Sequence, residues 1–181
     1  MTRQIRYLIM MGALLATDPN AWAAAMTPEQ AYAAIPHQRP IFDVSAATMP
    51  AHEAAYLRQL FGVIDLAVKE RVETLVWLQS RHAQGDGVDD YDALLARLSA
   101  LEPPAKLRLV HRLVSEAIQE HRDVLRQWRR SPAAISMNHP LVRSSSQKLY
   151  QAYGRLIKIY ATEHPRNLQA FYDYFCSLDF L

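Results

Sequence analysis

Hydrophobic residues recur along most of this chain at intervals of three and four residues, which is the period of an amphipathic α-helix. When the segment after Pro104 is projected at about 100° per residue, its apolar side chains share one wide face. Similar stripes follow Pro50 and Ser146. The face after Pro104 is the best defined and contains Leu107, Val114, Ile118, Leu125 and Trp128. This pattern predicts an all-α fold.

Prolines and short polar residues mark where the first elements are expected. Thr27 followed by Pro28 is typical of a helix start, with the threonine as N-cap and the proline in the first turn. Pro36 and Pro40 then bracket an extended arm of about residues 36–47, because neither proline fits the interior of a helix.

Four principal helices are expected after this arm. Gly85-Asp86-Gly87 ends the first of them, and His164-Pro165 separates the last two. Ser144-Ser145-Ser146 is expected to cap the third, which would begin at Gln147. The predicted architecture is an elongated antiparallel helical bundle with principal helices near residues 50–83, 104–130, 147–163 and 166–178 and a shorter helix at 90–101.

The N-terminus has the organisation of a secretory signal peptide. Arg3 and Arg6 supply positive charge, and the apolar run YLIMMGALLA that follows is too short to span a membrane. Ala21-Trp22-Ala23 places small residues where a signal peptidase cleaves. We therefore expect removal of residues 1–23 and a periplasmic or secreted protein with a single helical domain, residues 24–181.

Composition limits the function classes open to this domain. Without the signal peptide, 18 basic and 17 acidic residues remain, a balance that argues against a general nucleic-acid binder. No further apolar run approaches the roughly 18 residues of a membrane span. Cys176 is the only cysteine in the sequence, so no intramolecular disulfide can form. Any electrostatic function must therefore come from the local placement of charge.

Several polar residues project into the predicted interior from different helices. Arg71, His121, Tyr153 and Tyr160 all fall within apolar stripes. A buried polar group without a hydrogen-bond partner costs about 1–3 kcal/mol, and an unpaired charge costs more. One interpretation is a polar pocket between the helices, where bundles hold ligands. The other is structural, with Arg71 reaching the surface and the tyrosine hydroxyls bonded to backbone or water.

The outer face of the helix after Pro104 carries a row of arginines. Arg108, Arg112, Arg122 and Arg126, which we call the arginine ridge, align within about 80° of arc. Guanidinium groups suit bidentate contact with carboxylates or phosphates. The alternative is an ordinary solvated face that the nearby acids Glu116, Glu120 and Asp123 partly neutralise.

Recognised cofactor and catalytic patterns are absent from the sequence. No two histidines have the i,i+4 spacing of a helical metal site, and HExxH, CxxC and the CxxCH of c-type haem attachment are missing. The sequence also has neither a G-x-S-x-G nucleophile elbow nor a glycine-rich phosphate loop. We therefore expect no enzymatic activity, no metal and no resident cofactor.

Two functional hypotheses follow. The favoured one is an exported, non-enzymatic binding or adaptor module that uses the arginine ridge or an apolar groove to contact an extracytoplasmic protein or an anionic surface. The competing hypothesis is a periplasmic carrier that holds a small ligand, haem or a metal among the interior polar residues. A Soret band, or stoichiometric copper or zinc in the purified protein, would favour the carrier.

Overall fold

The structure is a computed structural model that describes residues 27–35, 41–79, 89–131 and 138–179. The described residues form helices and connecting segments without any strand, so the all-α prediction is confirmed. The elements in chain order are α3 (Pro28–Ala33), α4 (Ala51–Gln79), α5 (Asp89–Ser99), the short 3-10 helix η1 (Ala105–Leu107), α6 (Arg108–Arg130), α7 (Pro140–Ile159) and α8 (Pro165–Leu178). The predicted signal peptide, residues 1–23, lies outside the described residues, as does part of the arm.

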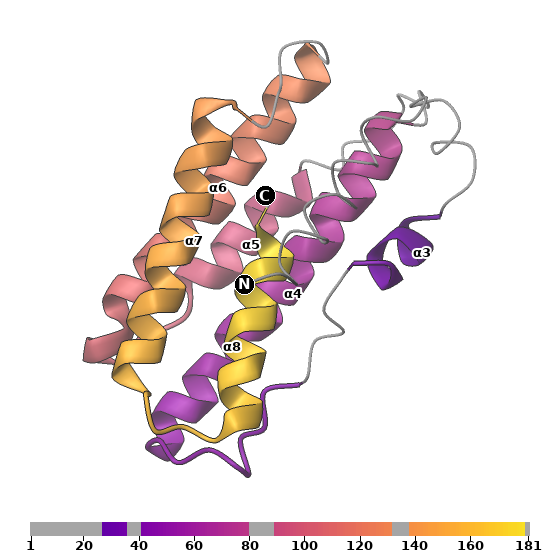
Figure 1. Ribbon diagram of the computed structural model, residues 1–181. Helices are drawn as coiled ribbons and strands as arrows, with labels where there is room; N and C mark the ends of the chain where they lie inside the picture. Colours follow the sequence, from indigo (N-terminus) through magenta and orange to yellow (C-terminus); the bar gives the residue numbers. More distant parts are fainter. Residues whose placement is uncertain (1–26, 36–40, 80–88, 132–137, 180–181) are drawn as a thin grey trace.

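Four long helices make the bundle, as expected (Figure 1). Helices α6 and α7 lie side by side and run in opposite directions, and α7 and α8 are likewise antiparallel. Helices α4 and α8, by contrast, run in the same direction. Helix α5 is short and contacts both α4 and α6, while α3 packs on α4. The parallel pair brings the start of α4 to the start of α8.

Helix α4 is the longest element and organises the core. Its 29 residues span about 43 Å and continue without interruption through Gly62, a position that faces open space. Residues 80–83 of the predicted helix, and the glycines expected to end it, lie outside the described residues. None of the described helices is long and apolar enough to cross a membrane.

The prediction that the triple serine caps the third helix is wrong. Helix α7 begins at Pro140, where His139 is the N-cap and its Nδ1 accepts a hydrogen bond from the Leu141 N–H. Proline fits the first turn because it has no N–H to satisfy and its φ is already helical. The three serines instead lie inside the helix, where the Ser145 hydroxyl donates to the Val142 carbonyl. Helix α8 starts in the same way, with His164 as N-cap before Pro165.

Helix α7 also ends earlier than predicted. Its last residue is Ile159, and Tyr160 leaves the helical conformation with φ −121° and ψ 44°. Residues up to Glu163 therefore form a turn instead of a last helical turn. This turn directs the buried Glu163 carboxylate at the start of α4.

An aromatic cluster joins the arm to the parallel pair of helices. Phe61 of α4 stacks on Tyr174 of α8 with ring centroids 4.6 Å apart, and it also contacts Phe171. Phe42 of the arm lies against Phe61 and Phe171 at centroid distances of 5.5 and 5.9 Å. Burying an aromatic side chain contributes about 1.5–3 kcal/mol, so Phe42 fixes this end of the arm to the bundle.

Candidate functional site

The arginine ridge divides into two pairs with different surroundings. Arg122 and Arg126 each donate to one oxygen of Asp92 on α5, at 2.8 and 2.7 Å. Arg122 also donates to Asp123. The hydrogen bonds from Arg122, followed by those from Arg126, hold the pKa of Asp92 below its usual value. This half of the ridge therefore joins α5 to α6.

The other half of the ridge faces solvent. Arg112 has a side chain that is 68% exposed, and its nearest acid is Glu116 on the same helix at 3.9 Å. Arg108, also exposed, donates only a long hydrogen bond of 3.4 Å to the Ala105 carbonyl. These two guanidinium groups remain accessible to a partner.

Two acidic residues of α6 pair with a lysine of α7. The Lys148 ammonium contacts both Glu120 and Glu116, and the Ser144 hydroxyl donates to Glu120 at 2.9 Å. Glu116 and Glu120 were the residues expected to neutralise the ridge. Because they face Lys148, they compensate Arg108 and Arg112 less than the sequence suggests.

The contacts of Lys148 also fix the register of the two antiparallel helices. They place residue 148 opposite residues 116–120, so the later part of α7 lies opposite the first turns of α6. Arg155 and Lys158, both exposed, are therefore level with Arg108 and Arg112. Helix α7 contains no acidic residue. We call this surface the basic seam: Arg108, Leu109, Arg112, Arg155 and Lys158.

Arg71 is buried and does not reach the surface, contrary to the structural interpretation, and its guanidinium binds the end of α8. Its exposed fraction is 3%, and it donates to the carbonyls of Ser177, Leu178 and Asp179 at 2.6–2.7 Å. The last carbonyls of a helix have no partner within the helix and carry partial negative charge. Arg71 supplies both the donors and the positive charge that this helix end needs.

His121 is fully buried on α6 and lies within electrostatic range of Arg71. Burial, with a smaller contribution from the Arg71 charge, places the pKa of His121 well below its usual value. The imidazole is therefore neutral at physiological pH.

Tyr160 belongs to a different group at the other end of α4. Its hydroxyl donates to Glu53 at 2.8 Å, and Lys106 contacts the same carboxylate at 2.7 Å. The Lys106 ammonium also lies over the Tyr160 ring, 4.7 Å from the centroid. Burial and the Glu53 carboxylate raise the pKa of Tyr160.

The four interior residues singled out in the sequence do not surround one point. Glu53 and Arg71 are 18 positions apart on α4, which is about 27 Å. Tyr160 and Arg71 therefore lie at opposite ends of the bundle. Tyr153 is half-buried and contacts the rings of Tyr172 and Phe175. His121 lies within electrostatic range of Arg71, whereas Tyr160 lies at the other end of the bundle from Arg71.

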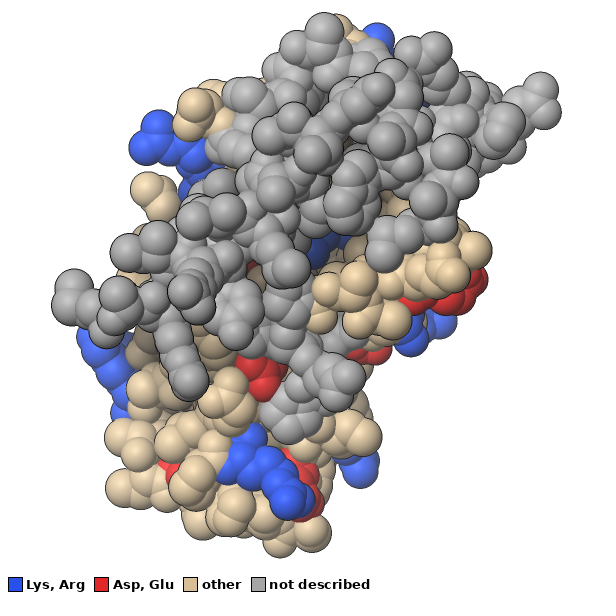
Figure 2. Space-filling model, turned by 45° about the vertical axis from the view of Figure 1, so that its right-hand side comes forward, with Lys and Arg blue, Asp and Glu red and all other residues tan. Residues whose placement is uncertain are grey.

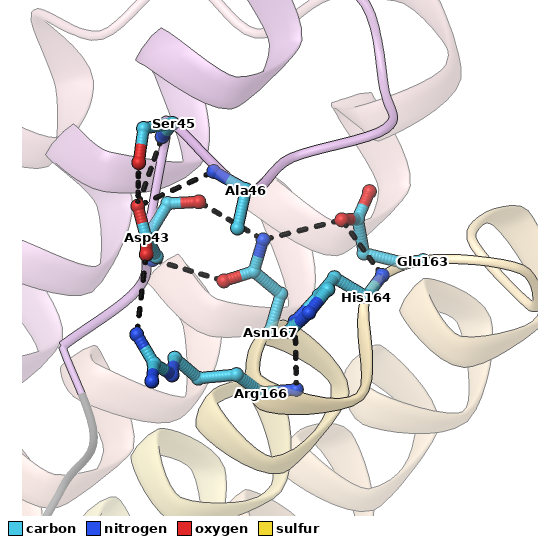
Figure 3. Close-up of polar contacts among 7 residues, drawn as sticks. All are labelled: Asp43, Ser45, Ala46, Glu163, His164, Arg166 and Asn167. Carbon is cyan, nitrogen blue, oxygen red and sulfur yellow. Dashed lines mark hydrogen bonds and ion pairs between the residues drawn. The ribbon is translucent and has the colours of Figure 1, made fainter.

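A polar network that the sequence reasoning missed joins the arm to the start of α8 (Figure 3). Asn167 is fully buried; its side chain accepts from the Asp43 N–H at 2.9 Å and donates to the Asp43 carbonyl at 3.1 Å. It also donates to Glu163 at 3.2 Å. The sequence held a signal for this residue, because Asn167 shares a helical face with Ala170, Phe171, Tyr174 and Leu178.

Glu163 is the centre of this network. Its carboxylate accepts from the N–H groups of Thr48, Met49 and His164 and from the Thr48 hydroxyl. Burial alone would raise the pKa of Glu163, but these hydrogen bonds outweigh it and keep the pKa below the usual value. Thr48 and Met49 precede Pro50 and the first residue of α4, so one carboxylate in the turn before α8 holds the segment that leads into α4.

An open depression of about 540 Å³ lies beside this network. It is lined by Ile41, Phe42, Asp43, Val44, Ser45, Arg58 and Arg166. Figure 3 shows the Arg166 side chain reaching from α8 to Asp43, where the donor–acceptor distance is 3.4 Å. The depression thus combines apolar side chains of the arm with two guanidinium groups.

In the described part of the chain, no three His, Cys, Asp or Glu side chains are placed to hold a metal ion. Cys176 is a partly buried free thiol, and burial raises its pKa. It does not have the exposed, electropositive surroundings of a reactive cysteine.

Comparison of the chain with protein-family models, with curated proteins and with solved structures gave no match in any of the three.

Proposed function

We propose that this protein is an exported, non-enzymatic binding module whose basic seam contacts an acidic segment of an extracytoplasmic protein. The observation that supports it is the separation of charge along the α6–α7 pair. Glu116 and Glu120 face Lys148 in one half. The other half carries four exposed cations, of which Arg112 has Glu116 3.9 Å away, and α7 contributes no acid to it. A partner that supplies carboxylates would complete the charge balance of this surface.

The chemistry of the seam favours a protein partner over a membrane. Leu109, which is 38% exposed, is a single apolar side chain among the cations. A helix that lies in a membrane interface needs a wide apolar face, and the outward faces of α6 and α7 lack one. Arginine can also bind a carboxylate through two parallel hydrogen bonds, which gives an acidic peptide a defined orientation.

Nucleic acid is a less suitable partner. On the described part of the face drawn in Figure 2, Lys and Arg side chains are separated by acidic and uncharged residues. Tracking a phosphate backbone requires a continuous stripe of positive charge.

Export predicts a defined mature mass. Protein recovered from the extracytoplasmic fraction should begin at Ala24, because the cleavage motif ends at Ala23. Intact-mass spectrometry measures this directly. Replacing Ala21 and Ala23 with bulky residues should retain the full-length chain. A retained Met1 in the unaltered, exported protein would contradict the proposal.

Neutralising the basic seam should weaken binding of an acidic peptide. The variant with Arg108, Arg112, Arg155 and Lys158 all changed to Gln is expected to bind a fluorescein-labelled Glu/Leu peptide at least about tenfold more weakly, since exposed ion pairs contribute up to about 1 kcal/mol each. Fluorescence anisotropy measures the affinity. Binding to the unaltered protein should also weaken as the salt concentration rises.

A matched control separates the seam from general positive charge. Changing Arg129, Arg130, Arg143 and Lys69 to Gln removes the same number of charges elsewhere and should leave peptide binding nearly unchanged. If both variants lost the same peptide affinity, the effect would come from net charge and not from the seam. Stronger binding of the seam to anionic lipid vesicles than to the peptide would reject the protein partner.

A further inference from the structure

The depression beside the arm is a second surface with a chemistry of its own. It lies where the arm meets α4 and α8, and its lining includes none of the residues of the basic seam. Its volume of about 540 Å³ falls within the range of pockets that hold small organic ligands. Two neighbouring residues of its lining differ sharply in exposure: Ile41 is 81% exposed and Phe42 is 3% exposed.

The wall of this depression is held in place by the core. Phe42 packs against Phe61 and Phe171, and both backbone groups of Asp43 bond to the buried Asn167. A ligand therefore meets a surface that is already ordered, which lowers the entropic cost of binding.

The charged side chains of the depression differ in how far they are paired. Asp43 Oδ1 already accepts from the Ser45 N–H, the Ser45 hydroxyl and the Ala46 N–H, and Oδ2 is approached by Arg166. Arg58 is exposed and makes no hydrogen bond or ion pair with another described residue. The Asp43 carboxylate thus pairs with Arg166 and is largely engaged, whereas Arg58 is available to an anion.

We propose that this depression binds a small carboxylate with an apolar body. The carboxylate would lie between Arg58 and Arg166, and the apolar body would cover Ile41 and Val44. An extended peptide fits less well, because peptides that add to an extended segment pair with its backbone. Asn167 already occupies both backbone groups of Asp43.

Hexanoate is a suitable probe of this site. Titration of the mature protein with hexanoate, followed by NMR of an isotopically labelled Ile41 methyl group, should give saturable shifts with a dissociation constant of about 1 mM. Hexan-1-ol has the same apolar body without the charge, and acetate has the charge without the body. Both should bind at least about tenfold more weakly.

Substitutions decide whether Arg58 is responsible. Arg58→Gln should weaken hexanoate binding about tenfold and Arg58→Lys should weaken it less, since lysine keeps the charge but loses the bidentate geometry. Arg112→Gln on the basic seam is the control and should have no effect. Arg58 is exposed, so the fold should persist, which circular dichroism verifies. Equal affinity for hexanoate and hexan-1-ol, or no change in Arg58→Gln, would overturn the proposal.

Discussion

Replacing Arg71 with Ala is expected to lower the free energy of unfolding by about 3–5 kcal/mol, the largest effect among the substitutions considered. The guanidinium is 3% exposed and donates to three consecutive carbonyls at the end of α8. Removing it leaves these acceptors without their donors and removes the positive charge that stabilises the helix terminus. Urea denaturation followed by circular dichroism measures the change.

Two further variants give this prediction its controls. Arg71→Lys keeps the charge but cannot reach three carbonyls with one planar group, so its loss should be intermediate. Arg143→Ala removes an exposed arginine of α7 and should change stability by less than about 0.5 kcal/mol. Hydrogen exchange in Arg71→Ala should increase first in the last turn of α8. Unchanged exchange there would contradict the assigned role.

Replacing Glu163 with Ala is expected to cost about 2–4 kcal/mol. This carboxylate accepts from three backbone N–H groups and two side chains, and it is 4% exposed. Its loss leaves the N–H groups before α4 unsatisfied and detaches the turn before α8 from the arm. Glu102→Ala, at an exposed position, is the matched control and should have little effect.

The pH dependence provides an independent measurement of the same residue. The pKa of Glu163 is lower in the folded protein than its ordinary value, so its contribution to stability is complete above about pH 4.3, the unfolded value. That contribution is lost as the pH falls through the lower, folded pKa. Glu163→Gln does not titrate and should show a shallower loss of stability in this acidic window. Identical acid denaturation curves for the two proteins would show that Glu163 is not the responsible group.

Local features were the most predictable part of the fold. The start of α3 follows directly from Thr27 and Pro28: Thr27 is the N-cap, in a capping box with Gln30, and Pro28 fits the first turn. The burial of Arg71 and His121 follows from the helical period, because each occupies an inward position between apolar neighbours. Each of these signals involves only a few neighbouring residues, so it can be predicted from a single sequence.

Competing local signals explain the error at α7. Three consecutive serines and a His-Pro pair both favour a helix start, and the sequence offers no ranking between them. The outcome depended on distant partners, because Ser144 donates to Glu120 of α6 and Ser146 donates to Asp179. These contacts exist only once the helices are packed.

The sequence by itself determined the helical class, the capped start of α3 and the burial of Arg71 and His121, because periodicity and capping act over one or two turns. Only the tertiary structure decided what those residues contact. Arg71 donates to the carbonyl of Ser177, 106 positions along the chain, and Asp92 accepts from Arg122 and Arg126 of the arginine ridge. Such pairings depend on the direction and register of helices. Many registers bury the same apolar stripes, and the packed side chains select among them.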